Sequence, residues 1–352
     1  MGSGAGERYA EKQYLCGGKD IKQQEIMRQD RLRIVFMGTP DFAVASLEAL
    51  LASRHEVVGV VTMPDKAIGR HHDVLQASPV KECALRHGLP VLQPERLRDE
   101  AFLAQLRALR ADLQVVVAFR MLPEVVWGMP RLGTFNLHAA LLPQYRGAAP
   151  INWAIIHGDD RTGITTFWLD HQIDTGRIIC QESMPIGPDD CAGDIHDRMM
   201  VQGAALVCRT ADMIADGEAE AVPQEQFMTD EPLRPAPKIF KETCQVQWDT
   251  LDVQGAHNFV RGLSPYPAAW TTLEEPSGKR AVLKLYRTHP EAHDHALPTG
   301  TLETDGRKWL RVALRGGYLY LEELQLAGKK RMPVEDFLRG AHVEGARVVS
   351  VE

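Results

Sequence analysis

Short apolar runs alternate with segments in which apolar residues recur every three or four positions, from residue 33 to residue 215. The short runs predict buried strands, expected at residues 33–37, 57–61, 113–119, 134–138, 163–169 and 177–182. The periodic segments predict helices at residues 44–52, 78–87, 103–113, 149–157 and 195–215. Strands separated by helices imply parallel pairing with right-handed crossovers. The expected fold class is α/β, with a doubly wound, mostly parallel, Rossmann-like sheet.

The pattern changes after residue 216. Residues 217–237 are rich in Pro, Gln and Glu and predict a linker. Short strands separated by turns follow at residues 281–286, 300–302, 309–313 and 317–326, which favours a small OB-like β-barrel. We therefore expect a disordered leader over 1–30, an α/β domain over 31–216, the linker over 217–237 and a C-terminal barrel domain over 238–352.

Composition narrows the classes of protein. A chain of 352 residues favours about two domains. No stretch approaches the roughly 18 apolar residues of a membrane span, which excludes an integral membrane protein with helical spans. The leader lacks the apolar core of a signal peptide and carries too many acids for a transit peptide. Six cysteines without a CxxC pair are typical of reduced thiols, so we expect a cytoplasmic protein without structural zinc.

Charge is distributed unevenly. The whole chain has 40 basic and 47 acidic residues, a net charge of −7. Residues 231–352 hold 17 basic and 16 acidic residues, and the remainder holds 23 and 31. An acidic front part and a nearly neutral back part indicate two modules with different partners.

The first predicted strand ends in Gly38-Thr39-Pro40, where a dinucleotide fold would carry its glycine-rich turn. With one glycine there, the G-x-G-x-x-G pattern fails and binding of NAD or FAD is disfavoured. The chain has no Walker A, HExxH or G-x-S-x-G motif. Most familiar nucleotide-binding and hydrolase chemistries are therefore disfavoured.

The densest polar motif lies at the end of the strand predicted at 134–138. Asn136 and His138 are two residues apart and point to the same face, while Leu137 points to the other. In open α/β sheets, ligands bind beyond the carboxyl ends of the strands. An amide and an imidazole there can polarise a carbonyl and stabilise an oxyanion. The alternative is a structural pair that caps the strand end.

Asp174, in the sequence IDTG, is the second polar candidate. Beside an imidazole, its carboxylate would favour the charged ring and hold its orientation. The alternative is a turn residue that satisfies nearby backbone N–H groups. The pairs His71-His72 and His293/His295 have no partner cluster in the sequence, so we expect no metal site.

From Arg33 to about Gly340 the chain resembles the methionyl-tRNA formyltransferases, a branch of the folate-dependent formyltransferases. The motifs that carry this resemblance occur in order: FMGTPDFA, TMPDKAIGR, FNLHAALLPQYRGAAP, IDTG, KIFKETCQVQW, VRGLSPYPAAW and LQLAGKKRM. The resemblance implies transfer of the formyl group of 10-formyltetrahydrofolate to the amino group of initiator methionyl-tRNA, giving N-formylmethionyl-tRNA for translation initiation. It implies no metal ion.

The resemblance also implies roles for individual residues. Asn136 and His138 would hold the formyl oxygen, and Asp174 would orient His138 and assist proton transfer. The folate would lie against Met121, Leu122 and the turn of Ala140, Leu141, Leu142 and Pro143.

Initiator tRNA would be bound by both domains. In the front domain, Phe42 would line the methionyl pocket, and Gly69 and Arg70 belong to the loop that meets the acceptor end. In the C-terminal domain, phosphates would be met by Lys238, Lys241, Lys329, Lys330 and Arg331. The alternative for the last three is a solvated turn.

The chain departs from the family pattern in three places. His71-His72-Asp73 stands where Gly-Lys-Lys is usual, which removes positive charge from the loop. Arg120 replaces a small residue at the mouth of the folate site, and Ala140 replaces a serine.

Other functions are compatible with the same central motif. Formyl transfer to glycinamide ribonucleotide is disfavoured by the C-terminal domain, and transfer to an amino sugar by the KIFKE and GKKRM motifs. A hydrolase that releases formate is a third alternative. A catalytically silent RNA-binding protein is a fourth, and the intact trio of Asn136, His138 and Asp174 disfavours it.

Overall fold

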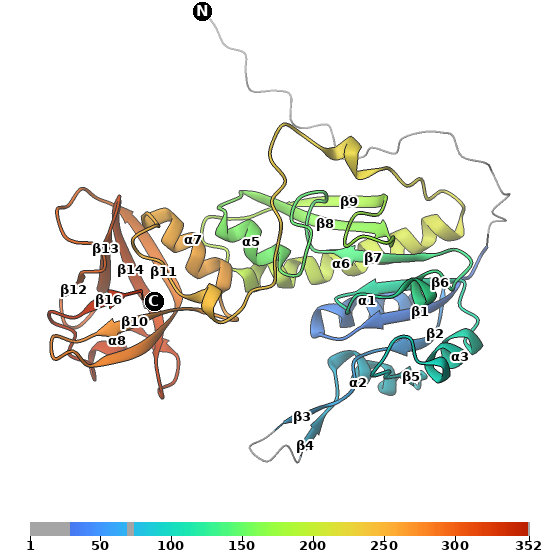
Figure 1. The fold of residues 1–352 in the computed structure, drawn as a ribbon, viewed down its shortest axis with the longest axis horizontal. Helices are drawn as coiled ribbons and strands as arrows, with labels where there is room; N and C mark the ends of the chain where they lie inside the picture. The colour runs from blue at the N-terminus through green and yellow to red at the C-terminus, as the bar shows by residue number, and fades with distance from the viewer. Residues whose placement is uncertain (1–28, 69–73, 351–352) are drawn as a thin grey trace, which may run out of the picture. The chain divides into compact units, whose positions relative to one another are not determined.

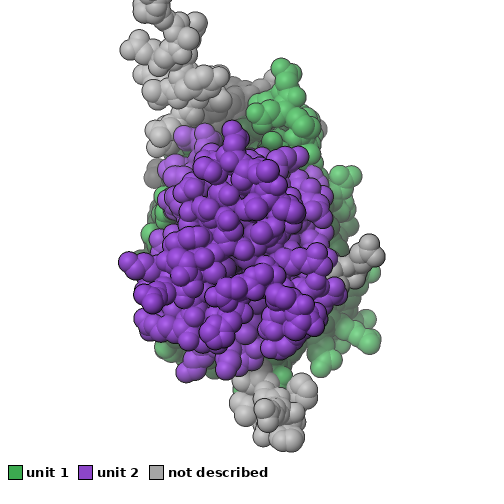
Figure 2. Space-filling model, turned by 90° about the vertical axis from the view of Figure 1, so that its left-hand side faces the viewer, with its two compact units in different colours: residues 1–146, 163–183, 198–234 green, residues 147–162, 184–197, 235–352 purple. Residues whose placement is uncertain are grey.

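The computed structural model describes residues 29–68 and 74–350, and these contain two large sheets. The chain divides into two units, coloured separately in Figure 2. Unit 1 comprises residues 1–146, 163–183 and 198–234, and unit 2 comprises residues 147–162, 184–197 and 235–352. None of the helices in the described part of the chain combines the length and the apolarity needed to cross a bilayer.

The first sheet has seven strands in the order β5-β2-β1-β6-β7-β8-β9 (Figure 1). Their bounds are β1 Arg33–Gly38, β2 Glu56–Val61, β5 Val91–Leu92, β6 Leu113–Val117, β7 Thr134–His138, β8 Arg161–Trp168 and β9 Ile178–Pro185. The strands from β5 to β7 pair in parallel, whereas β8 runs antiparallel to β7. The central strand β1 is fully buried from residue 34 to residue 37, as expected for a parallel sheet covered on both faces. The predicted α/β class and mostly parallel sheet are confirmed.

Helices lie between these strands along the chain or follow the last of them. They are α1 Asp41–Ala52, α2 Pro79–Arg86, α3 Glu100–Ala108, α4 Glu124–Trp127 and α6 Ala192–Ala215. The side chain of Ser78 accepts from the backbone N–H of Lys81 and caps α2, with Pro79 at its first position, as the sequence predicts. The helix predicted at 103–113 was placed wrongly. It starts earlier because Asp99 caps α3, and it ends before Arg110, which has a φ of +49°.

A short hairpin was not predicted. Strands β3 Lys66–Ile68 and β4 Val74–Gln76 pair with each other and extend from unit 1 away from its large sheet (Figure 1). They enclose residues 69–73, which lie outside the described residues. Both strands have three residues, and Lys66, Ala67, Leu75 and Gln76 are exposed, so the segment lacks the buried-face alternation that identifies a strand.

Unit 2 contains the second sheet, in the order β12-β13-β14-β11-β10-β16, with β15 paired to β14. The strands are β10 Ala269–Glu274, β11 Arg280–Ala292, β12 Leu302–Thr304, β13 Leu310–Leu314, β14 Gly317–Leu326, β15 Met332–Pro333 and β16 Arg347–Val349. All recorded pairs are antiparallel, and a bridge between Thr301 and Arg347 joins the two ends of the order. The sheet therefore closes almost completely into a barrel, which confirms the predicted second architecture.

Helices α5 Pro150–Ile156, α7 Val253–Leu263 and α8 Val334–Leu338 also belong to unit 2. Asp252 caps α7 by accepting from the backbone N–H of Gly255. The apolar face of α7 packs into the barrel core through Val253, Ala256, Val260 and Leu263. Two 3-10 helices, Gln224–Phe227 (η1) and Glu242–Cys244 (η2), complete the described elements.

Candidate active site

Strand β7 places the two polar residues of the central motif on one face, as predicted. His138 is 6% exposed, and Asn136 is half-buried. The opposite face carries Leu137, which packs closely on Gly203 of α6. Within the described residues, the side-chain amide of Asn136 makes no hydrogen bond. This amide is therefore available to a ligand.

His138 is held at both ring nitrogens. Its Nε2 lies 2.8 Å from the backbone oxygen of Tyr145, and its Nδ1 lies 3.8 Å from Oδ2 of Asp174. A carbonyl oxygen only accepts, so Nε2 carries a proton. Nδ1 then faces a carboxylate, an arrangement that is favourable when a proton lies between the two groups. The structure thus brings together His138 and Asp174, which are 36 residues apart in the sequence.

Asp174 lies in a tight turn between β8 and β9. Its φ is +54°, a conformation that Asp tolerates better than most residues. Two residues later, Gly176 passes so close to the end of β8 that an added Cβ would lie 1.6 Å from the backbone oxygen of Trp168. Only glycine fits there. The side chain of Asp174 is 14% exposed, so its carboxylate is largely screened from water.

Two further residues join this arrangement, and neither was identified from the sequence. Gln224, at the start of η1, is 1% exposed and donates from Nε2 to the backbone oxygens of Asp174 and Gly176, both at 2.8 Å. Its Oε1 accepts from Arg146 Nε at 3.0 Å and Nη2 at 2.6 Å. Gln224 lies in the Pro- and Gln-rich stretch, whose composition gives no sign of a buried glutamine.

The turn after β7 is fixed by Thr165 and Gln181. Thr165 Oγ1 donates to the backbone oxygen of Ala140 at 2.6 Å and accepts from the backbone N–H of Leu142 at 3.2 Å. Gln181 Nε2 donates to the backbone oxygen of Leu142 at 2.7 Å and to Thr165 Oγ1 at 2.9 Å. The turn is therefore rigid, and the backbone groups of Leu142 already have partners.

The residues predicted to contact folate differ in exposure. Met121 is 74% exposed and Leu141 is half-buried, so both side chains reach the surface. Leu122 belongs to a core cluster beneath the sheet, and the side chains of Ala140, Leu142 and Pro143 are buried as well. Contacts from these four to a ligand would be limited to their backbone.

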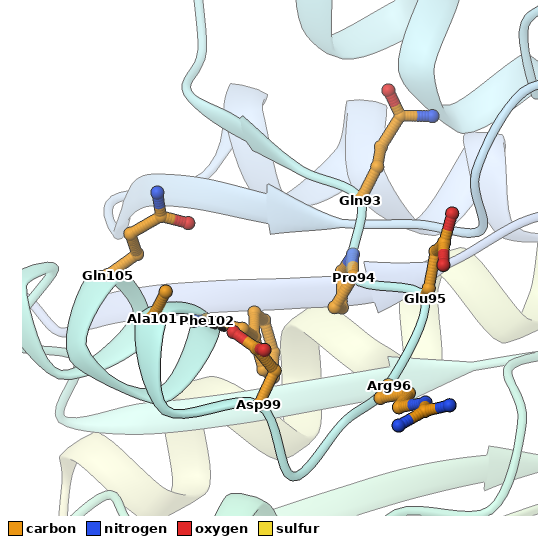
Figure 3. Close-up of a pocket in the computed structure, with 8 residues that line it drawn as sticks. All are labelled: Gln93, Pro94, Glu95, Arg96, Asp99, Ala101, Phe102 and Gln105. Carbon is orange, nitrogen blue, oxygen red and sulfur yellow. Dashed lines mark hydrogen bonds between the residues drawn. The ribbon is translucent and has the colours of Figure 1, made fainter.

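The side chain of Arg120 is held by backbone carbonyls. It donates to the backbone oxygens of Pro94 and Glu95, the latter at 2.9 Å, and burial lowers the pKa of its guanidinium. These carbonyls belong to the loop that leads into α3. Figure 3 shows a pocket of about 490 Å³ formed by this loop and the first turns of α3. None of the residues predicted for the active site lines it.

Comparison with known proteins gives the family. Residues 32–210 match the formyl transferase family, and residues 238–342 match the formyl transferase C-terminal domain. The methionyl-tRNA formyltransferase of Parabacteroides distasonis is 60% identical over 315 residues, which cover 89% of this chain and 97% of the relative. That of Bacteroides fragilis is 54% identical over 320 residues, covering 91% and 98%. The chain belongs to the methionyl-tRNA formyltransferase family.

A solved structure shows the same fold at low identity. WlaRD, a sugar 3N-formyl transferase crystallised in the presence of dTDP and 5-N-formyl-THF, superposes with a TM-score of 0.57 at 15% identity, covering 85% of this chain and 99% of its own. The resemblance to the methionyl-tRNA formyltransferase family seen in the sequence is thus confirmed, and the chain is a formyl-transferring enzyme.

The residues that the family resemblance assigns to tRNA are spread over both units. In unit 1, Phe42 lies on α1 and is 8% exposed, while Gly69 and Arg70 lie outside the described residues. In unit 2, Lys238 lies over the ring of Phe240, and Lys241 is exposed.

The basic cluster near the chain end is not uniform. Lys329 and Lys330 are exposed, whereas Arg331 stacks on Tyr286 and forms a two-point ion pair with Glu323. That pair raises the pKa of Arg331 and offsets its charge.

Groups with metal-ligand chemistry occur elsewhere in this member of the methionyl-tRNA formyltransferase family. Glu48, Cys83 and His87 place their donor atoms within 4.8 Å of one another, but Glu48 also pairs with Arg86 at 3.2 Å. Burial, then the bond to Glu48, raises the pKa of the Cys83 thiol to about 11. This cluster joins α1 to α2 by hydrogen bonds and ion pairs. His295 forms hydrogen bonds with backbone groups, and the rings of His293 and His295 both pack against Tyr318. These two histidines therefore have structural contacts within the barrel.

Proposed function

We propose that this chain transfers the formyl group of 10-formyltetrahydrofolate to the α-amino group of initiator methionyl-tRNA. The observation that carries the proposal is the placement of His138 between the Tyr145 carbonyl and the Asp174 carboxylate, with the Asn136 amide on the same strand face. Relatives with 54% and 60% identity are named methionyl-tRNA formyltransferase, which supports the proposal.

The chemistry requires an oxyanion to be stabilised and one proton to be moved. The amino nitrogen attacks the formyl carbon, the C=O electrons move to oxygen, and the C–N bond to the folate then breaks. We assign stabilisation of the oxyanion to the Asn136 amide, which donates to it, and to the positive charge of a protonated His138 beside it, because groups placed where charge develops lower the barrier most.

The proton leaves the attacking amine and ends on the folate nitrogen that departs. We assign its transfer to the pair of His138 and Asp174, which faces carboxylate to imidazole at 3.8 Å. The products are N-formylmethionyl-tRNA and tetrahydrofolate. These roles leave no step for a metal ion.

We assign the folate to the residues at the carboxyl end of the sheet. The exposed Met121 and the half-buried Leu141 offer apolar contact, and the unbonded amide of Asn136 offers a polar one. We assign the backbone of Leu122, Ala140 and Pro143 to the same ligand, and Leu142 to supporting that turn. WlaRD was crystallised with a formylated folate, which supports a folate co-substrate on this fold.

We assign tRNA binding to Phe42, Gly69 and Arg70 in the front domain, and to the basic residues of unit 2. Exposed lysines bind phosphate groups through charge, independently of sequence. Because the acceptor is a substrate of translation, we expect the protein in the cytoplasm.

The experiment is formyl transfer from 10-formyltetrahydrofolate to initiator methionyl-tRNA, with elongator methionyl-tRNA and amino-sugar nucleotides as competing acceptors. Formylation of initiator methionyl-tRNA by the wild type, and its loss in H138A, is expected. Turnover on an amino sugar, a nucleotide or water in preference to tRNA would overturn the proposed acceptor.

A further inference from the structure

Gln224 uses its whole side-chain amide inside the protein. Both hydrogens of Nε2 are donated, to the backbone oxygens of Asp174 and Gly176, and Oε1 accepts two N–H groups from Arg146. Glutamine is the residue that has two donors and a double acceptor at this reach. Because this side chain is 1% exposed and uses all its hydrogen-bonding groups, it fixes the positions of the backbone and side-chain groups to which it is bonded.

Gln224 is bonded to both of the loops whose residues contact His138. Tyr145, whose carbonyl receives His138 Nε2, directly precedes Arg146. Asp174, whose carboxylate faces His138 Nδ1, has its own carbonyl bound by Gln224. The contacts form a closed circuit from His138 through Tyr145, Arg146, Gln224 and Asp174 back to His138. Gln224 is the member that closes it.

The segment that carries Gln224 is attached by other contacts. Val222 and Ile178 exchange two backbone hydrogen bonds of 2.8 Å, and Arg177 Nε donates to the backbone oxygen of Ala221. Phe227, in the same 3-10 helix as Gln224, packs on the cluster of Leu142, Phe167 and Ile178. Removing the amide of Gln224 therefore leaves the segment docked.

We propose that Gln224 and Arg146 are positioning residues that fix the Asp174 turn so that its carboxylate faces Nδ1 of His138. This inference rests on the proposed function, because it assumes that His138 and Asp174 take part in the transfer. The positive φ of Asp174 is the physical reason why such a brace is needed. A residue in that region is retained only when its surroundings over-determine it.

The test is Gln224→Met, which keeps the length of the side chain and removes the amide. A shift of a catalytic group by about 1 Å costs on the order of 100-fold in rate. We expect kcat to fall by about 10- to 100-fold, while KM for the folate and for the tRNA changes less than about threefold. Arg146→Met is expected to act in the same direction.

Gln224→Glu is the second variant, because its volume is nearly unchanged. Its carboxylate still accepts from Arg146 but places an oxygen against the two carbonyls, so it should lose as much activity as Gln224→Met. The matched control is Gln114→Met. Gln114 is also 1% exposed in unit 1 and accepts from Thr134 at 3.0 Å, but it has no contact with the circuit. The Gln114→Met variant should lose thermal stability and keep the wild-type kcat.

Two readouts separate positioning from a general structural role. The imidazole ¹⁵N chemical shifts of His138, measured at one fixed pH, should change in Gln224→Met and stay unchanged in Gln114→Met. In an Asp174→Asn background, Gln224→Met should cost less than about threefold, since both changes act through one carboxylate. Wild-type kcat and unchanged His138 chemical shifts in both Gln224 variants would overturn the inference. Full activity of H138A and D174A would instead overturn the proposed site.

Discussion

His138 in unit 1 and His257 in unit 2 are both almost fully buried, at 6% and 4% exposure. In each, Nε2 faces a backbone carbonyl, that of Tyr145 for His138 and that of Pro188 for His257. They differ at Nδ1, where His257 meets the hydroxyl of Thr288 at 3.0 Å and His138 meets the carboxylate of Asp174 at 3.8 Å. A hydroxyl donates to a bare nitrogen, so the neutral His257 ring is satisfied. A carboxylate cannot donate unless it is protonated, so His138 sits where a proton can move.

Burial alone therefore does not separate the histidine that we propose for catalysis from a structural one. One turn along α7 from His257, Arg261 donates to the side chain of Asn258 and to the backbone oxygens of Gly187 and Asp190. The burial of His257 lowers its pKa, and the nearby positive charge of Arg261 acts in the same direction. This network holds α7 to residues 187–190 of unit 2, whereas the network around His138 includes an amide, that of Asn136, without a bond in the described chain.

The largest expected difference follows from removing each ring. His138→Ala should lower formyl transfer by about 10²- to 10³-fold, because it removes the proton carrier and a charge that stabilises the oxyanion. His257→Ala should keep kcat but lose about 1–3 kcal/mol of stability, because Thr288 loses a buried partner. Single-turnover kinetics and thermal denaturation of both variants measure this. Equal loss of activity in the two variants would contradict the comparison.

Asp174→Ser gives His138 the kind of Nδ1 partner that His257 has. We expect at least a 10-fold loss of kcat, because a proton-accepting carboxylate is replaced by a neutral hydroxyl and general acid–base catalysis contributes about 10²- to 10⁴-fold. Asp174→Asn is the control for the backbone, since Asn tolerates a positive φ as well as Asp does. Similar losses in both variants would assign the effect to the carboxylate. Retention of kcat by Asp174→Asn would assign it to the turn.

His257 also predicts how stability depends on pH. Its folded pKa lies below the unfolded value, so both states are neutral above about pH 6.5 and the histidine has no effect there. Below that pH the unfolded chain binds a proton that the folded chain does not, and stability falls by at most about 1.4 kcal/mol per pH unit. Urea unfolding at pH 7.5 and 5.5 should show a smaller difference between the two pH values for His257→Gln than for the wild type. An unchanged difference would remove His257 as its source.

The smallest expected effects concern the basic cluster of unit 2. Lys329→Ala and Lys330→Ala should each weaken tRNA binding a few-fold and reduce the slope of log affinity against log salt by about 1. Arg331→Ala should weaken it less, because Glu323 already holds that guanidinium. Binding titrations at several salt concentrations would measure this, with kcat at saturating tRNA unchanged. A larger effect for Arg331 than for the lysines would mean that the ion pair opens on binding.

The sequence was informative where one local rule decides the structure. Strand alternation placed Asn136 and His138 on one face, and Ser78-Pro79 marked the start of α2. It was not informative where contacts between distant segments decide. Gln224 reaches Arg146 across 78 positions and Asp174 across 50, and no periodicity records such pairs. The approach of Asp174 to His138 was expected only through the family resemblance, because the local sequence by itself favoured a turn residue that bonds nearby backbone N–H groups.

The hydrogen bonds of residues 221–234 have a consequence for exchanging modules. This stretch looks like a connector, yet it is bonded along its length to unit 1, from Ala221 to Arg234, whose backbone oxygen accepts from the backbone N–H of Tyr145 at 2.7 Å. A chimera that joins this front module to a foreign C-terminal domain should therefore be spliced after Arg234. A junction at residue 216 would place another protein's glutamine, or none, at the position of Gln224 beside the candidate active site. The same holds when the genes of relatives recombine. The position at which the front module can be exchanged intact therefore lies about twenty residues beyond the end of α6.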